Sequence, residues 1–156
     1  MAQSPRAVLM VDPHGFNPNP ETAADNAFQD AAISDAGERA TVAAEARVEV
    51  ARIASRLRDL GVDVLLFDDL PGSDVPDSVF PNNWISTHDD GRIVLYPMAT
   101  PSRRRERRPD IVEALRERFV VSDVVDLSAM EGDALYLEGT GALVLDHVGR
   151  IAYVAR

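Results

Sequence analysis

An internal repeat is the feature that most constrains the fold of this 156-residue chain. Residues 79–99 and 137–156 align on matching Gly-Arg-Ile triplets that begin at Gly91 and Gly149, which are 58 residues apart. Each copy predicts a strand, a turn with acidic and His residues, and a return strand. A predicted helix and a further strand separate the copies. A repeated ββαβ-type unit of this length indicates modules arranged around a common centre.

The first third of the chain predicts a helix between two strands. Continuous apolar runs at residues 7–11 and 62–67 are typical of buried strands. Apolar residues at steps of three and four over residues 38–60 predict a helix, which Gly61 would end. Residues 21–37 have weak periodicity, and we expect a loop with one or two helical turns. The expected inner face of the helix comprises Ala43, Ala46, Val50, Ile53, Leu57 and Leu60.

The second half predicts a hairpin, a helix and more strands. Residues 89–91 (DDG) are a hairpin turn signal between strands at 84–87 and 92–97. Pro81 has no backbone N–H, so any strand over residues 79–87 must be interrupted, bulged or at an edge. Further strands are expected at 124–127, 135–145 and 151–154. A helix should begin at Pro109, with an inner face of Ile111, Val112, Leu115 and Phe119.

Composition excludes several classes of protein. The chain has no cysteine, which rules out disulfides, thiolate zinc sites and a cysteine nucleophile within these residues. The net charge of −10 argues against general nucleic-acid affinity. No apolar run approaches the length of a membrane span, and the N-terminus lacks the apolar region of a signal peptide. We therefore expect a cytoplasmic protein with no membrane or nucleic-acid partner, no metal and no organic cofactor.

Residues 76–86 (PDSVFPNNWIS) and 101–104 (PSRR) gather two amides, an indole, a carboxylate and a run of guanidinium groups around the predicted hairpin. A core strand does not need that collection. The adjacent amides of Asn82 and Asn83, at the break that Pro81 causes, can point out of the sheet end into a pocket. The alternative is that they only shape a turn, and Asp77, after Pro76, could likewise only cap one.

Three motifs carry a family resemblance: residues 76–84 (PDSVFPNNW), 101–106 (PSRRRE) and 137–141 (LEGTG). Together they resemble the N-terminal half of the arginine deiminase, dimethylargininase and amidinotransferase superfamily, the penteins, and most closely its citrulline-hydrolase-like amidinotransferase branch. The resemblance runs from about Val8 to the last residue. It implies an α/β fold that is part of a five-module α/β propeller, with about two to three ββαβ-type modules and mixed sheets. Residues 1–156 would then form one incomplete propeller domain.

The resemblance also implies a site. In that superfamily a Cys near the far C-terminus attacks the central carbon of a guanidino or ureido group, and a His acts as general acid and base. The three His residues, His14, His88 and His147, match no catalytic position, so no catalytic residue is assigned. By motif position, Asn83 stands where guanidinium-binding relatives have Asp, Asn82 and Asp77 line the same edge, Glu138 matches a substrate-gripping acid, and Arg103 matches the Arg that binds the substrate's α-carboxylate.

Two departures from the superfamily motifs lower the negative charge: Asn83 in place of Asp, and Thr140-Gly141 in place of Gly-Asp. A guanidinium cation wants paired carboxylates, whereas a neutral ureido group needs a donor for its C=O and acceptors for its N–H groups. An amide has both. This favours a ureido substrate such as citrulline over arginine.

Without cysteine, the covalent route is closed to these residues alone, and nothing in the sequence pairs Ser78, Ser86 or Ser102 with a base. Three hypotheses follow: a substrate-binding half of a hydrolase on C–N bonds of citrulline- or arginine-type compounds, a non-catalytic small-molecule binding module, or an inactive truncated fragment. The first requires a complementing C-terminal half that supplies Cys and His. Modules of an open ring would also expose apolar faces and strand edges, which favours self-association.

Overall fold

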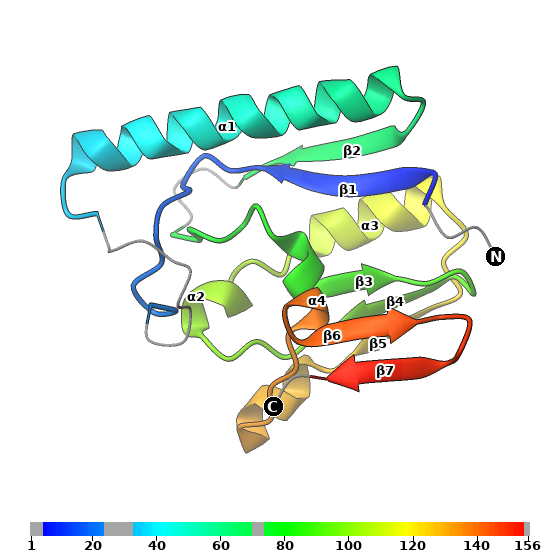
Figure 1. The fold of residues 1–156 in the computed structure, drawn as a ribbon. Helices are drawn as coiled ribbons and strands as arrows, with labels where there is room; N and C mark the ends of the chain where they lie inside the picture. The colour runs from blue at the N-terminus through cyan, green and yellow to red at the C-terminus, as the bar shows by residue number, and fades with distance from the viewer. Residues whose placement is uncertain (1–4, 24–32, 70–73, 155–156) are drawn as a thin grey trace. The chain divides into compact units, whose positions relative to one another are not determined.

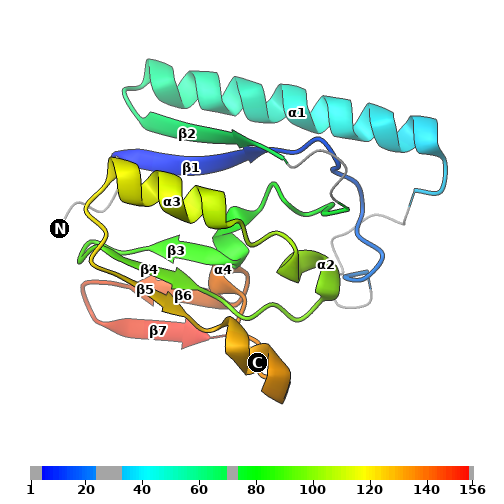
Figure 2. The same ribbon diagram turned by 180° about the vertical axis from the view of Figure 1, so that it is seen from behind.

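The computed structural model describes residues 5–23, 33–69 and 74–154. It divides the chain into two compact units, Met1–Pro81 and Asn82–Arg156, and we describe each by itself (Figures 1 and 2). The expected helical turns within residues 21–37 fall largely on residues 24–32, which lie outside the described part of the chain.

The first unit is built on a parallel strand pair joined by a helical crossover. Strands β1 (Ala7–Asp12) and β2 (Asp63–Asp68) pair in register from Ala7↔Asp63 to Asp12↔Asp68. Parallel strands need a long connection, and α1 (Ala36–Asp59) is its main part, lying along the pair in Figure 1. Both strands and the helix are confirmed as predicted.

Helix α1 begins where the Asp35 carboxylate accepts a 2.8 Å hydrogen bond from the Glu38 N–H. It ends before Gly61, whose φ of +81° suits glycine. Its buried residues are Ala43, Val50 and Ala54. The prediction was wrong for Ile53 and Leu60, which are 52% and 68% exposed, because a two-stranded sheet covers only a narrow line of a helix.

The second unit holds a mixed three-stranded sheet of order β3-β4-β5. Strands β3 (Ile85–Thr87) and β4 (Arg92–Leu95) form the predicted antiparallel hairpin, and β5 (Asp123–Asp126) pairs with β4 in parallel. Helix α3 (Pro109–Arg118) makes the crossover from β4 to β5. It buries Ile111, Val112 and Leu115 as expected. Phe119 is 39% exposed instead, because it lies beyond the helix end in extended backbone.

Several short elements connect these strands. Residues 76–79 form turns, and the interruption predicted at Pro81 is confirmed, since a 3₁₀ turn, η1 (Pro81–Asn83), begins there. Helix α2 (Pro101–Arg104) and the 3₁₀ segment η2 (Ser128–Asp133) follow later. The strand predicted over residues 135–145 was wrong for most of its length: it contains helix α4 (Gly139–Ala142), and only β6 (Leu143–Asp146) is extended.

The second copy of the repeat is also a hairpin. Strands β6 and β7 (Ile151–Val154) pair antiparallel as a separate two-stranded sheet. A helical turn precedes each hairpin, η1 before β3 and α4 before β6. The fold is therefore a mixed α/β fold with several sheets. Closure of five modules, and the number of modules in this chain, stay predictions, as does the single partial domain over residues 1–156.

Among the described residues, no helix combines the length and the apolar character that crossing a bilayer requires.

Candidate functional site

The adjacent asparagines of the PNNW motif lie in η1. Pro81 suits the first position of this turn because its φ is fixed and it has no N–H to satisfy. Asn83 is buried, at 9% exposure, whereas Asn82 is exposed. The Asn82 Nδ2 group donates a 3.1 Å hydrogen bond to Oδ1 of Asn83. The two side chains therefore form one hydrogen-bonded amide pair immediately before β3.

The amide pair sits against the glycine and threonine residues of α4. The Thr140 Oγ1 atom accepts a 2.5 Å hydrogen bond from Asn82 Nδ2, and its hydroxyl donates to the Asn82 backbone oxygen at 3.4 Å. A Cβ atom on Gly139 would overlap that same backbone oxygen, and one on Gly141 would lie 2.9 Å from Asn83 Oδ1. Both positions therefore admit only glycine without a shift of the asparagines, a contact that sequence reasoning missed.

Glu138, directly before α4, is held at both carboxylate oxygens. Oε1 accepts a 3.1 Å hydrogen bond from the Ala99 N–H, and Oε2 lies 3.6 Å from Nη1 of Arg103. The Glu138 side chain remains 25% exposed. Glu138 adjoins Gly139, which packs against the Asn82 backbone oxygen. Four of the predicted site residues thus form two contacting pairs, Asn82 with Asn83 and Arg103 with Glu138, and the LEGTG motif supplies a contact to each pair. We call these four residues the cluster.

Arg103 is a buried member of this cluster. Its Nε and Nη2 groups donate to the two carboxylate oxygens of Glu106 at 3.1 and 3.3 Å. The side chains of Arg103 and Glu106 are only 8% and 1% exposed. Glu106 was not singled out from the sequence, although its i,i+3 spacing from Arg103 was a usable signal. The role of Arg103 as an anchor for a substrate carboxylate stays a prediction; in the structure its guanidinium contacts the protein carboxylates of Glu106 and Glu138.

Asp77 belongs to the first unit. Its Oδ2 atom accepts a 2.7 Å hydrogen bond from Nδ2 of Asn19, a residue that is only 1% exposed. This contact was not predicted from the sequence. In the next position, the Ser78 hydroxyl donates to Asp69 at 2.9 Å. Asp77 therefore has a structural partner, and its contact with a substrate stays a prediction.

The expectation that no base pairs with Ser86 was wrong. The Ser86 Oγ atom lies 2.9 Å from Nε2 of His88 and 2.8 Å from the hydroxyl of Tyr96. Residues i and i+2 of a strand share a face, so the Ser-x-His spacing could have revealed this pair. The His88 ring also packs edge-on against His147, with centroids 5.9 Å apart. Burial, and then the charge of His147, hold the pKa of His88 below its ordinary value.

The serine–histidine pair resembles the start of a nucleophile–base arrangement. The geometry of the Ser86–His88 hydrogen bond suits a structural role better than a catalytic one. Tyr96 is buried, at 5% exposure, and its hydroxyl faces Ser86 across the hairpin. The Ser86 hydroxyl is therefore held between two partners that link β3 to the residue after β4.

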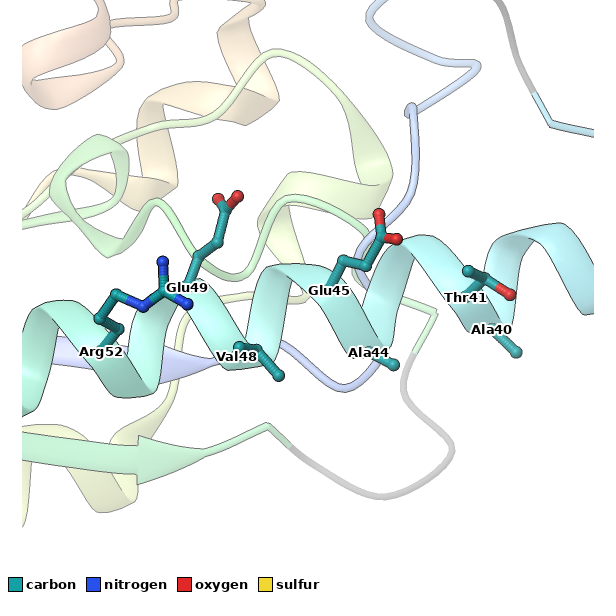
Figure 3. Close-up of a pocket in the computed structure, with 7 residues that line it drawn as sticks. All are labelled: Ala40, Thr41, Ala44, Glu45, Val48, Glu49 and Arg52. Carbon is teal, nitrogen blue, oxygen red and sulfur yellow. The ribbon is translucent and has the colours of Figure 1, made fainter.

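Two other features carry no assigned role. In the first unit, ligand atoms of Asp12, His14 and Asp68 lie within 4.8 Å of one another. Arg47 already donates two 2.9 Å hydrogen bonds to the Asp12 carboxylate, and Asp68 is 84% exposed, so we assign no metal there. A solvent-open hollow also runs along α1 (Figure 3); its lining comes from that helix alone, and includes Ala44, Val48 and Arg52 but no predicted site residue.

Comparison with solved structures supports the fold. ArgZ, an arginine dihydrolase from the ornithine–ammonia cycle in cyanobacteria, matches with a TM-score of 0.58 at 22% identity. Unliganded AgrE matches with a TM-score of 0.62 at the same identity. Both alignments cover 95% of this chain, but only 20% and 19% of those chains. The isolated N-terminal domain of ArgZ, as a cysteine-to-serine variant bound to substrate, is covered to 48% with a TM-score of 0.58.

A search of curated protein sequences finds no match to this chain. A family model described as N,N dimethylarginine dimethylhydrolase, eukaryotic, matches residues 12–156. This span contains the amide pair, the LEGTG motif and the PSRRRE motif that the structure brings together. The chain therefore belongs to the N,N dimethylarginine dimethylhydrolase family, within the pentein, or amidinotransferase, superfamily.

Proposed function

We propose that this chain carries substrate-binding residues of a hydrolase that acts on C–N bonds of guanidino or ureido compounds, of the arginine or citrulline type. The observation that supports the proposal is that the LEGTG motif contacts both other motifs within the second unit: Thr140 contacts Asn82 of the amide pair, and Glu138 lies 3.6 Å from Arg103. Asp77 is proposed as a further ligand residue.

The solved relatives support this substrate class. The ArgZ N-terminal domain is described with bound substrate, and an asparagine-to-serine variant of it with a covalently bound reaction intermediate. AgrE is described in complex with ornithine and NAD⁺. An amino acid with a nitrogen-rich side-chain end is therefore the ligand type that we propose here. The Glu138 carboxylate would accept hydrogen bonds from its N–H groups.

Within the class, we favour a ureido headgroup over a guanidinium. The amide pair is neutral, and the Glu138 carboxylate lies 3.6 Å from Nη1 of Arg103, which balances part of its charge. A guanidinium cation gains most from a pair of carboxylates that no protein base already contacts. A ureido group gains from neighbours that both donate and accept.

Hydrolysis through a thiolate needs a cysteine that these 156 residues lack. We propose that the nucleophile and its His come from sequence outside them, in the same protein or in a complementing chain. The same lack of cysteine favours one alternative, a non-catalytic small-molecule binding module. An inactive truncated fragment is the remaining possibility.

Calorimetric titration with L-citrulline and L-arginine tests the binding proposal. We expect saturable binding that falls at least tenfold in Glu138→Gln and Asn83→Ala, because each change removes a polar group of the cluster. Arg116→Gln, in an exposed pair with Glu113 on α3, is the matched control and should bind normally. If neither ligand produces a heat of binding, the proposal is overturned. If the control variant loses as much affinity as the site variants, the loss reflects a general effect on folding.

Ammonia release separates the hydrolase from the binding module. The chain alone should release none from either compound. A candidate C-terminal half that contains Cys and His should restore release when it is mixed with this chain. Binding without restored release would favour the binding module.

A further inference from the structure

We infer that Glu131, in η2, is a positioning residue: it fixes the backbone of Met98 and Ala99, and this backbone in turn holds the Glu138 carboxylate in place for a ligand. The inference rests on the proposed function and deepens it, because Glu138 is a proposed ligand residue of the cluster. Neither Glu131 nor the segment at residues 98–99 belongs to the three sequence motifs.

Two glutamates accept hydrogen bonds from neighbouring backbone N–H groups. The Met98 N–H donates to Oε1 of Glu131 at 2.8 Å, and the Ala99 N–H donates to Oε1 of Glu138 at 3.1 Å. Only the φ and ψ angles of Met98 lie between these two N–H groups. The Met98 side chain is fully buried, at 0% exposure, which restrains both angles. A shift of the first N–H group therefore moves the second.

Glu131 is itself firmly held. Its side chain is 12% exposed, and its two carboxylate oxygens accept hydrogen bonds from Nη1 and Nη2 of Arg107 at 2.5 and 3.0 Å. Burial raises the pKa of the Glu131 carboxyl, but the hydrogen bonds from Arg107 and from the Met98 N–H outweigh it and hold the pKa below its ordinary value. Glu131 is therefore a charged and fixed acceptor.

Glu131 also reaches the same backbone through Arg104. Nε of Arg104 lies 3.5 Å from Oε2 of Glu131. The Arg104 guanidinium donates to the carbonyl oxygens of Met98 and Ala99 at 2.9 and 3.0 Å. Both N–H groups and both carbonyl groups of residues 98–99 are thus bound by charged side chains, although these residues belong to no strand.

This support matters because Glu138 would bind a ligand directionally. A binding group works when its supporting hydrogen bonds hold it to within about 0.5 Å. The Ala99 N–H is one of the two contacts that fix the Glu138 carboxylate, and the other is Arg103. Loss of Glu131 would free the Ala99 N–H to move and would leave Glu138 with one fixed contact.

A double-mutant cycle tests whether Glu131 acts through Glu138. Glu131→Gln keeps the size of the side chain but places an NH₂ group among the donors of Arg107 and Met98. We expect the dissociation constants for L-arginine and L-citrulline, measured by titration calorimetry, to rise at least fivefold in the parent and less than twofold when Glu138→Ala is already present. Equal rises in the two backgrounds would overturn the inference, because Glu131 would then support the fold without acting through Glu138.

The matched control is Glu113→Gln, which removes a carboxylate from the exposed pair with Arg116. It should change either dissociation constant less than twofold in both backgrounds. A rise as large as that of Glu131→Gln would overturn the inference, since loss of any glutamate–arginine pair would then have the same effect.

Hydrogen exchange without ligand separates this inference from the proposed function. In ¹H–¹⁵N spectra, Glu131→Gln should speed exchange of the Met98 and Ala99 N–H groups at least tenfold, whereas Glu138→Ala should speed it at Ala99 alone. Unchanged exchange in the amides of β4 reports that each variant stays folded. If neither ligand binds but this pattern is found, the proposed function fails and the coupling of Glu131 to the Glu138 contact stands. If exchange at Ala99 ignores Glu131→Gln, the inference fails even where both ligands bind.

Discussion

Asn82 and Thr140 hydrogen bond to each other and are 58 residues apart, the same offset that relates Gly91 to Gly149 in the internal repeat. The next pair in the alignment, Asn83 and Gly141, is also in contact. The helical turns that precede the two hairpins therefore meet at equivalent positions. The amide pair and the LEGTG motif thus lie where the two copies of the repeat contact each other.

Gly139 should tolerate no side chain. In Gly139→Ala, the new Cβ would overlap the backbone oxygen of Asn82, which cannot rotate away as a side chain could. We expect a loss of about 1–3 kcal/mol in the free energy of unfolding, the usual cost of overpacking, measured by urea denaturation. Gly132→Ala is the control, since a Cβ there meets no atom within 4 Å. Equal stability of the two variants would contradict the packing described for α4.

Glu106 should matter more than other acids of its region. Glu106→Gln removes the carboxylate that accepts two hydrogen bonds from buried Arg103, and breaking a buried pair costs about 3–5 kcal/mol. Urea denaturation should therefore show a large fall in unfolding free energy. In Glu113→Gln the lost pair, with Arg116 at 2.7 Å, is exposed, and a change below about 1 kcal/mol is expected. A small effect at both positions would contradict the predicted contribution of the Arg103–Glu106 pair to stability.

His88 should make stability depend on pH. Its pKa is lowered in the folded protein, first by burial and then by His147, from an ordinary value of 6.5. Below that pH the unfolded chain takes up a proton that the folded chain resists, so the free energy of unfolding should fall as the pH drops until the folded-state pKa is reached. Thermal melts at a series of pH values check this: as the pH drops below 6.5, the melting temperature of the parent should fall more steeply than that of His88→Gln.

His147→Gln gives the matching comparison for His88, because it removes the second cause of the lowered pKa and leaves the first. Its pH dependence should lie between those of the parent chain and His88→Gln. A His88→Gln profile parallel to that of the parent would refute the assignment to His88.

The β6–β7 hairpin should promote self-association. Val144 and Tyr153 are directly opposite each other in the register, and they are 67% and 58% exposed. Ile151, on the same face, is 47% exposed. A separate two-stranded sheet with an exposed apolar face and unpaired strand edges can associate with the same surface of another chain. Sedimentation velocity should show association that weakens in a Val144→Thr, Tyr153→Thr double variant.

Val48→Thr on α1 is the control for the hairpin, because Val48 is similarly exposed, at 58%, but lies on an isolated helix surface. It should leave the association unchanged. A single monomeric boundary at all concentrations would contradict the prediction.

The order and type of the main elements could be predicted because each has a local signal. The apolar run before Asp12, the Gly61 stop and the turn at Gly91 all depend on neighbouring residues alone. The predictions of which residues form the inner faces of the helices were less accurate. Ile53 fits the apolar period of α1, but the sheet beneath is too narrow to cover it, and no local pattern reports the width of a sheet.

The site could be predicted as a set of residue types but not as a set of contacts. The motifs indicated the two asparagines, Glu138 and Arg103, and in the structure these form two contacting pairs, Asn82 with Asn83 and Arg103 with Glu138. The partners Glu106 and Thr140 were missed as contacts because the first depends on burial and the second on a bond that spans 58 residues. The strand predicted through Gly139 was wrong because the apolar residues around the LEGTG motif outweighed its two glycines.

The contact between equivalent turns has an evolutionary consequence. If the two copies of the repeat descend from one duplicated segment, positions 82 and 140 once held the same residue type. At least one of the two positions has since been substituted while remaining in contact with the other. An amide on one side and a hydroxyl on the other make the pair directional, which two identical residues could not do. Substitutions at these two positions should therefore be inherited together.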